Sequence, residues 1–341
     1  MGETRERVTR ADVARMAGVS ETVVSYVINN NRYVAKEKRQ RVEEAVRILN
    51  YRPNNVARAL KGKQSNQIIF IADHITNEYF SSIVSEMDKY AYESGYLISL
   101  CSNRNTPEFI SQVISRQFDG IIVSSASFPT EYVEQFSQAG IPVVVFRRRR
   151  HQKAVEHVAY LGTGLYTGAR EAVKHLIAMG CRNVIYVDRI SAKGHISPPD
   201  DMRYGGFVDE MGANGFCVGP DSVICGCRSQ EELSEKIKKR LQMGSRVDGI
   251  FGRNDMLACI AMTAAGQIGF KVPEQLKVIG FDDSSISRLI TPRLTTIGMQ
   301  KGEIAKAAID MLTQMIGGSQ PNNRDFETML IERESTVDNN R

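Results

Sequence analysis

The first sixty or so residues carry apolar side chains at helical spacing. Apolar positions recur three or four residues apart, so each stretch would present one apolar face to a common core. The residues predicted to point inward are Val13, Met16 and Ala17, then Val23, Val24 and Val27, and finally Val42, Ala45, Val46 and Leu49. This pattern predicts a small all-α head.

Residues that start and stop helices bracket these stretches. Thr9 with Asp12 three positions later has the form of a capping box, and Ser20 can cap a second helix. Gly18 tolerates the left-handed backbone that ends a helix. A third helix is predicted over residues 36–49. We therefore place the head at residues 1–53 and a short hinge helix with its linker at 54–65.

From residue 66 onward, short apolar runs alternate with helical stretches. The runs are residues 68–72, 96–101, 120–123, 142–146, 184–187, 249–251 and 278–281. This alternation predicts parallel sheets covered by helices on both faces. Roughly 275 residues are too many for one compact sheet core. The predicted fold class is thus a small all-α helix-turn-helix head joined to an α/β region of two doubly wound parallel-sheet lobes, residues 66–341.

The composition is that of a globular protein. Hydrophobic residues make up 42% of the 341 residues and charged residues 24%. No stretch approaches the ~20 apolar residues of a membrane span, and no apolar run follows the charged N-terminus as in a secretory signal. We expect a cytoplasmic protein.

Cysteine and histidine positions do not predict a metal or catalytic site. Cys225 and Cys227 are one residue apart, but no second pair or histidine stands at zinc spacing. A redox or metal-binding pair is the alternative to reduced, structural thiols. Gly-x-Ser-x-Gly, phosphate-loop and His-Glu-x-x-His motifs do not occur. We expect no metal, no cofactor and no enzymatic activity.

Charge is unevenly distributed along the chain. Residues 1–64 contain 14 Lys and Arg against 7 Asp and Glu, whereas the remainder contains 30 against 32. A basic head on a slightly acidic body suggests that the head contacts a polyanion, with a solvated basic face as the alternative.

Motifs along most of the chain resemble those of the LacI/GalR repressor family. Residues 8–20 with Val23-Val24-Ser25 resemble its helix-turn-helix, and residues 50–60 resemble its hinge. Further motifs follow in family order: Asp119-Gly120-Ile121-Ile122, Gly140-Ile141-Pro142-Val143, Arg203 before Gly206-Phe207, Asn254-Asp255, Val278 to Asp283, and Thr291 to Thr296. The resemblance implies a sequence-specific repressor with a sensor of the periplasmic-binding-protein-like type.

The resemblance implies that the second helix enters the major groove, where Glu21, Thr22 and Tyr26 are the outward positions. Tyr26 stands where many members carry arginine, so it could read a base, contact a phosphate or pack partly against the head. Candidate phosphate contacts, which fix register without reading sequence, are Ser20, Ser25, Asn29, Arg32, Tyr33 and Arg58. Thr9 and Asn54 complete the candidate DNA-binding residues.

Leu60 matches the hinge leucine of the family, which wedges into the minor groove and kinks the duplex. The alternative is that Leu60 packs on the sensor. The wedge needs two copies, so the resemblance implies a homodimer on a roughly palindromic operator.

The resemblance also implies that a small, sugar-like effector binds between the lobes, beyond the carboxyl ends of the strands. The aromatic pair Tyr79 and Phe80 could stack on a sugar or base ring. An ion pair between the lobes is the alternative role for Arg203 and Asp282, and loop capping is the alternative for His74. The candidate effector-binding residues are His74, Tyr79, Phe80, Arg147, Arg203, Phe251, Asn254 and Asp282. Lobe crossings are predicted near 161–164, 291–294 and 321–326.

Three departures from the family pattern raise the positive potential near this site. The run Arg147 to Arg150 follows a predicted strand, Gly164-Leu165 replaces a common Asp-Asn pair, and Arg253 precedes Asn254. Arginine suits carboxylates and phosphates, so we hypothesise a sugar acid or sugar phosphate as effector. The alternative is that most of the arginine run is a solvated loop.

Two other classes of protein use related folds. A solute-binding protein for transport would carry a signal sequence in place of a basic helical head. A nucleotide-dependent enzyme would carry Gly-x-Gly-x-x-Gly after the first strand, Ile68–Ala72, and it is absent. The sequence therefore favours allosteric repression, and whether effector releases or promotes DNA binding stays open.

Overall fold

The computed structural model describes residues 8–52, 64–73, 78–151, 153–243 and 246–337. The chain separates into two units, residues 1–65 and 66–341, which are described separately. The predictions for His74, Asn54, Arg58 and Leu60 concern positions outside the described residues.

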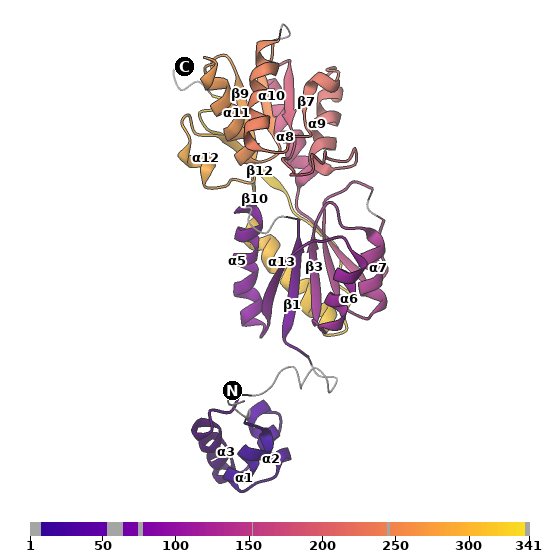
Figure 1. Cartoon of the computed structure of the whole chain (residues 1–341), viewed down its shortest axis with the longest axis vertical. Helices are drawn as coiled ribbons and strands as arrows, with labels where there is room; N and C mark the ends of the chain where they lie inside the picture. The colour runs from indigo at the N-terminus through magenta and orange to yellow at the C-terminus, as the bar shows by residue number, and fades with distance from the viewer. Residues whose placement is uncertain (1–7, 53–63, 74–77, 152, 244–245, 338–341) are drawn as a thin grey trace, which may run out of the picture. The chain divides into compact units, whose positions relative to one another are not determined.

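The first unit contains α1 (Arg10–Ala17), α2 (Glu21–Asn29) and α3 (Lys36–Ile48) (Figure 1). The capping box predicted for α1 is present, because the Thr9 hydroxyl accepts from the Asp12 backbone N–H and the Asp12 carboxylate accepts from that of Thr9. Gly18 ends α1 at a φ of 63°, and Ser20 caps α2. Helix starts and stops in this unit thus follow from the residues at the helix ends.

A small core holds the head together, formed by Val13, Ala14, Ala17, Val24, Val27, Val42, Ala45 and Tyr51. The prediction for Met16 was wrong, because its side chain is 49% exposed and Ala14 is buried instead. On an eight-residue helix, residues at i, i+1 and i+4 can form the buried face as readily as those at i, i+3 and i+4.

The first lobe of the second unit is built on a parallel sheet with the strand order β11-β5-β4-β3-β1-β2. Its strands are β1 (Gln67–Ala72), β2 (Leu97–Ser102), β3 (Gly120–Ser124), β4 (Val143–Arg147), β5 (Val158–Gly162) and β11 (Arg324–Asp325). Its helices are α5 (Glu78–Glu93), α6 (Pro107–Ser115), α7 (Thr130–Gln138) and α13 (Lys301–Ile316).

The second lobe has the strand order β12-β10-β9-β8-β6-β7, with β12 antiparallel to β10 and the other pairs parallel. Its strands are β6 (Val184–Val187), β7 (Val223–Ile224), β8 (Gly249–Gly252), β9 (Lys277–Phe281), β10 (Thr295–Met299) and β12 (Thr328–Ile331). Its helices are α8 (Leu165–Ala178), α9 (Met202–Ala213), α10 (Gln230–Gln242), α11 (Asp255–Gln267) and α12 (Ile286–Leu289), with a short 3-10 turn at Pro220–Ser222.

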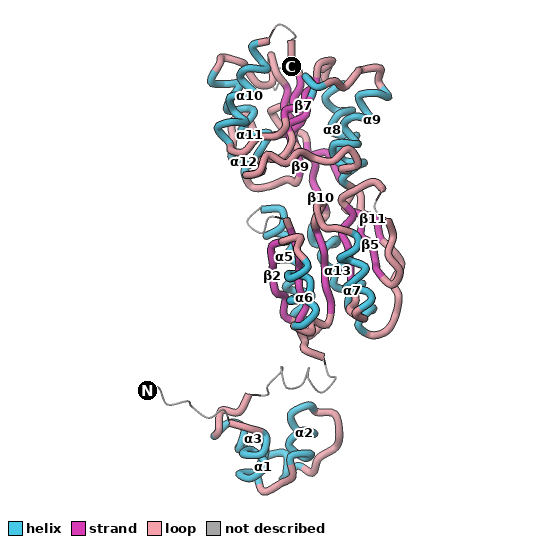
Figure 2. The backbone as a smooth tube through the Cα atoms, turned by 45° about the vertical axis from the view of Figure 1, so that its right-hand side comes forward, coloured by secondary structure: helices cyan, strands magenta, loops and turns pink. Residues whose placement is uncertain are grey.

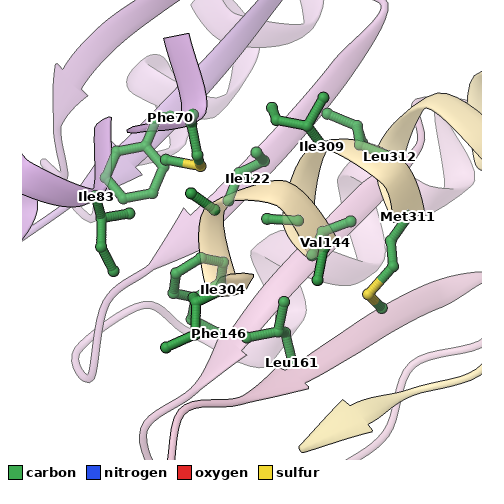
Figure 3. Close-up of a cluster of buried hydrophobic side chains, with 14 of the residues drawn as sticks. Phe70, Ile83, Ile122, Val144, Phe146, Leu161, Ile304, Ile309, Met311 and Leu312 are labelled. Carbon is green, nitrogen blue, oxygen red and sulfur yellow. The ribbon is translucent and has the colours of Figure 1, made fainter. Parts of the chain in front are cut away.

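Helices cover both faces of each sheet, as the alternating pattern predicts. In the first lobe, Phe70, Ile122, Val144 and Phe146 pack beneath α5 and α13 (Figure 3). A second core on the opposite face contains residues of α6 and α7. Two corresponding cores enclose the second sheet. The doubly wound, two-lobed fold class is therefore confirmed.

The chain passes between the lobes after β5, after β10 and after β11. Figure 2 shows β10 of one lobe leading directly into α13 of the other. The predicted second crossing at 291–294 was placed too early, because those residues precede β10 within the second lobe. The chain leaves that lobe only at Gln300, after β10 has paired with β9.

Among the described residues, no helix is long and apolar enough to cross a membrane. The same residues contain no cluster of three or more His, Cys, Asp and Glu side chains arranged to hold a metal ion.

Candidate DNA interface and effector cavity

The exposed surface of α2 begins at its capped N-terminus. Ser20, Glu21 and Thr22 are exposed there, and Tyr26 lies half-buried one turn further along. Val24 and Val27 anchor the opposite face of α2 in the head core. The helix can therefore present polar side chains to DNA while remaining fixed to the head.

Some predicted DNA-contact side chains also serve the head itself. The Asn29 amide donates to the Ser25 backbone carbonyl (2.8 Å) and hydroxyl (3.1 Å). The Thr9 hydroxyl donates to Asp12 (2.6 Å). Tyr33 is 93% exposed. The exposed Arg32 guanidinium lies 5.2 Å from the centre of the Tyr26 ring.

A partly open cavity of about 240 Å³ lies between the two lobes. The first lobe contributes the residues that follow β1 and β4 and the first turn of α5. The second lobe contributes residues that follow β6, β8 and β9, together with the first turns of α9 and α11. The lining residues are Asp73, Tyr79, Phe80, Ala126, Arg148, Arg189, Ile190, Arg203, Arg253, Asn254, Met256, Leu257 and Asp282. The cavity thus occupies the place expected for a ligand site in doubly wound sheets.

Arg148 brings a buried positive charge to this cavity from the end of β4. Its residue exposure is only 6%, and its guanidinium lies 5.1 and 5.2 Å from the ring centres of Tyr79 and Phe80. Nη2 donates to the Ser124 hydroxyl (2.9 Å), and Nε has no hydrogen-bond partner among the described residues. The aromatic pair thereby holds the arginine in place.

The nearby carboxylate Asp73, directly after β1, is already engaged by the loop that follows β3. It accepts hydrogen bonds from the Ser125 and Ser127 hydroxyls and from the Ala126 backbone N–H. Burial opposes its ionisation, but these hydrogen bonds outweigh burial and hold the pKa of Asp73 below its usual value. Asp73 is therefore ionised and lies close enough to Arg148 to interact electrostatically without forming a direct ion pair.

Arg253 occupies a different environment on the second lobe. Its two terminal nitrogens donate to both oxygens of Asp201, at 2.8 and 2.7 Å, and Nη1 also donates to Ser197 (2.8 Å). Asp188 lies 3.7 Å away. Burial opposes ionisation of Asp201, but the charge and hydrogen bonds of Arg253 hold its pKa at about 2. Arg253 is therefore locally neutralised.

Arg203 and Asp282 face each other at 3.8 Å, and both are buried. Arg203 also donates to the backbone carbonyl of Arg253 and lies over the ring of Phe281. Asp282 has a φ of 101°, a conformation that costs energy in a residue other than glycine. Burial raises the pKa of Asp282, while Arg203 opposes that rise. Within the described residues, Oδ1 of Asp282 accepts no hydrogen bond.

Asp255 lies just behind the cavity, in the first turn of α11. It accepts hydrogen bonds from the Ser284 N–H (2.6 Å) and hydroxyl (2.8 Å) and from the Thr296 hydroxyl (2.5 Å). Burial, together with the neighbouring Asp282, raises its pKa to about 7. Asp255 thus ties the segment after β9 to the start of α11.

Direct contacts join the two lobes on either side of the cavity. Both carboxylate oxygens of Glu78 accept from Ser285, at 2.6 and 2.9 Å. Arg149 pairs with Asp200 at 2.8 Å, and Arg150 pairs with Asp209 at the same distance. The lobes are therefore held together in this structure on either side of the cavity.

The structure brings together five of the predicted effector residues: Tyr79, Phe80, Arg203, Asn254 and Asp282 all line the cavity in the described part of the chain. Asn254 also caps α11, by accepting from the Leu257 N–H.

Arg147 does not line the cavity. Side chains alternate between faces along β4, so Arg147 lies on the same face of the sheet as Val145. Its guanidinium lies over the Tyr160 ring, with Nη1 3.9 Å from Oδ1 of Asp325. Phe251 does not line the cavity either, because its side chain is fully buried against Tyr186 within the core of the second lobe. Strand β8 continues to Gly252, and only the residues after it reach the cavity.

The predicted set omitted several lining residues. The polar ones are Asp73, Arg148, Arg189 and Arg253, and the apolar ones are Ala126, Ile190, Met256 and Leu257. Asp73, Arg189 and Arg253 stand directly after the last residues of β1, β6 and β8 or one position beyond them. Their position beyond the strand ends was a usable signal, but exact strand ends were needed to exploit it.

A larger, open groove of about 800 Å³ lies on the second lobe between α10, α11 and α12. Met256, Cys259, Ile260, Ile286, Leu289 and Ile290 make it largely apolar, and Glu231, Glu235 and Lys238 border it. Leu289 is 79% exposed. Met256 lines both this groove and the cavity.

Comparison with known families matches both units. Residues 9–54 match the model of bacterial regulatory proteins of the lacI family, and residues 173–336 match a periplasmic binding protein-like domain. The HTH-type transcriptional repressor PurR of Pasteurella multocida is 32% identical over 329 residues, 95% of each chain. PurR of Histophilus somni strain 129Pt is 32% identical over 313 residues, 90% of this chain and 92% of that protein.

Solved structures show the same fold. The lac repressor dimer bound to operator and the anti-inducer ONPF matches with a TM-score of 0.81 and 24% identity, covering 98% of this chain and 100% of that one. A LacI-type regulator from Alkaliphilus metalliredigens complexed with D-xylulofuranose matches with a TM-score of 0.66 and 28% identity, covering 80% and 100%.

A helix-turn-helix head followed by two doubly wound lobes defines a bacterial transcription regulator that carries its DNA-binding and sensor units in a single chain. The relatives of this chain are regulators rather than enzymes. The chain belongs to the LacI family of bacterial regulatory proteins and is a DNA-binding transcriptional repressor of that family.

Proposed function

We propose that this repressor binds its operator as a homodimer and that a small, sugar-like acid bound between the lobes controls its affinity for DNA. The observation that carries the proposal is the cavity of about 240 Å³ between the lobes, lined by charged side chains from both of them. A ligand that contacts both lobes stabilises one arrangement of the lobes over another, and such differential binding is what shifts a two-state equilibrium.

Arg148 supports an acidic effector. Its guanidinium is buried, held by aromatic rings and hydrogen-bonded to a neutral serine, and its Nε has no hydrogen-bond partner among the described residues. Asp73 acts on it only at longer range, so a ligand carboxylate or phosphate would supply the direct ion pair that Arg148 does not make with Asp73. The N-terminal turns of α5 and α11 also reach the cavity, and helix N-termini favour anions. The free oxygen of Asp282 would accept a hydrogen bond from a ligand hydroxyl.

The groove between α10, α11 and α12 is the surface we assign to the second copy of the chain. Its apolar lining and exposed Leu289 are suited to burial in an interface. On its border, Lys238 pairs with Glu235 of the same helix at 2.8 Å, so the apolar lining is what supports this assignment. Because Met256 lines both the cavity and this groove, we expect effector binding in the cavity to alter the groove and thereby the interface between the two copies.

Thermal melting against a ligand panel tests the effector proposal. The panel contains neutral sugars, the matching sugar acids and sugar phosphates, and purine bases as a planar alternative. A ligand at 100 times its dissociation constant adds about 2.7 kcal/mol to the free energy of unfolding. A rise in Tm with an acid or phosphate, and a smaller rise with the neutral parent, is expected. A rise with neutral sugars alone overturns the acidic class, and a rise with purines alone overturns the sugar-like class.

A further inference from the structure

We propose that Arg32, held against the ring of Tyr26, reads a guanine in the major groove of each operator half-site. Arg32 lies outside α2, in the loop after the helix, and its guanidinium stacks over the Tyr26 ring at 5.2 Å. The loop thereby delivers an arginine to the surface of the recognition helix, although the helix itself contains none.

The stacked pair lies on the same face of α2 as the residues at its exposed start. Thr22 and Tyr26 are four positions apart and so are neighbours along one side of the helix. Thr22 and Glu21 are exposed, whereas Val24 and Val27 are buried in the head core. Val23, predicted to point inward, is only partly buried and is not part of that core. When α2 lies in the major groove, Tyr26 and its arginine are one turn along from the first base-facing positions.

Arg32 is also available for DNA. The ion pairs of the described part of the head are made by Arg15, Arg39 and Arg47, and Arg32 is not among them. Stacking on an aromatic ring restricts a flexible guanidinium and leaves its edge donors free. Arginine donates two parallel hydrogen bonds to O6 and N7 of guanine, which are presented only in the major groove.

Base reading and phosphate binding predict different results for the same substitution. Loss of a base contact relaxes specificity at one position, whereas loss of a phosphate contact weakens binding to all sequences and reduces its salt dependence. The pair lies one helical turn beyond the exposed Thr22 on the same side of α2, and this position favours base reading.

The experiment selects operators from a random duplex library with the full-length protein and then measures affinities by fluorescence anisotropy. Arg32→Ala and Tyr26→Ala are expected to lose a guanine preference at the same position of both half-sites. Replacing that guanine should weaken the unmodified protein by roughly 5- to 150-fold and these variants by far less. Tyr26→Phe keeps the ring and should keep the preference. Arg47→Ala, which removes a charge from α3, is the matched control and should keep it too.

Circular dichroism melting verifies that each variant head is folded. Equal weakening of Arg32→Ala on all sequences, with a shallower salt dependence, would assign Arg32 to a phosphate and overturn the proposal. A guanine preference lost in Arg32→Ala but kept in Tyr26→Ala would overturn the role of the ring. Neither result bears on the effector cavity, so the two proposals fail independently.

Discussion

Arg253 and Asp201 form a two-pronged ion pair in which each terminal nitrogen of the arginine donates to a separate carboxylate oxygen, at 2.8 and 2.7 Å. Both side chains are nearly buried. This pairing changes the interpretation of the arginine-rich cavity. Arg253 has its counter-charge within its own lobe, whereas Arg148 on the opposite lobe hydrogen-bonds to a serine hydroxyl. Of the two arginines, Arg148 is therefore the one on which the proposed acidic effector depends.

The Arg253–Asp201 pair should be costly to break from one side. Asp201→Asn keeps the helix cap on α9 but leaves the Arg253 charge buried, so the free energy of unfolding should fall by about 3–5 kcal/mol. Urea denaturation measures this change. Asp200→Asn, beside it but paired with the more exposed Arg149, should cost about 1 kcal/mol or less. Equal losses in both variants would contradict the assigned importance of the buried pair.

Arg148 should determine the response to acidic ligands. In Arg148→Gln, affinity for the acid that stabilises the unmodified protein should fall by roughly 10- to 100-fold, because a charge-assisted hydrogen bond is lost. Ligand-dependent melting or calorimetry measures the loss. Arg149→Gln is the matched control from the same arginine run, since Arg149 pairs with Asp200 and should leave ligand affinity nearly unchanged. A larger effect at Arg149 than at Arg148 would refute the assignment.

Asp255 should make stability fall as pH rises. Burial and Asp282 raise its pKa in the folded protein to about 7, above the unfolded value near 3.8, so the folded state binds the extra proton between these values. Its contribution is full below about pH 4 and is lost as pH rises through 7, at up to about 1.4 kcal/mol per pH unit. Asp255 and Asp282 titrate together, so the slope belongs to the pair.

Asp255→Asn tests this pH dependence, because an amide can mimic the protonated acid toward Ser284 and Thr296. Urea denaturation between pH 4.5 and 7.5 should give a flatter dependence for the variant than for the unmodified protein. Parallel curves would show that the Asp255 carboxyl does not titrate in this range.

Leu289 should be needed for assembly. Leu289→Glu places a charge in the apolar groove assigned to the second copy and should convert a dimer to a monomer in analytical ultracentrifugation. Met243→Glu, at an exposed methionine after α10 and outside the groove, is the control and should leave the mass unchanged. A dimeric Leu289→Glu variant would place the interface elsewhere.

Local rules in the sequence predicted much of the fold. Thr9, Asp12 and Gly18 specified where α1 begins and ends, because capping needs only neighbouring residues. The alternating apolar runs predicted strands in both lobes, since parallel strands buried on both faces are almost wholly apolar. They did not include β5, β10 or the short strands β7, β11 and β12. Met16 shows the limit of this approach, because a short helix leaves several faces equally apolar.

The site was harder to predict than the fold. Strand ends identified the region of the cavity, but a shift of one residue decides whether Arg147 or Arg148 reaches it. Asp201, the counter-charge of Arg253, lies some fifty residues away in sequence, so the pair is visible only after folding. The sequence alone therefore overestimated the positive charge that is free to bind a ligand.

Operator binding with and without the acid identified by melting, measured for the unmodified protein and for Arg148→Gln, tests whether the effector controls the repressor through this cavity. Fluorescence anisotropy with an operator selected from random duplexes gives both dissociation constants. We expect the acid to change operator affinity of the unmodified protein by about 5- to 150-fold, in either direction, and to leave Arg148→Gln unchanged at the same concentration. An operator affinity that a saturating acid does not alter, or alters equally in both proteins, would contradict effector control through this cavity.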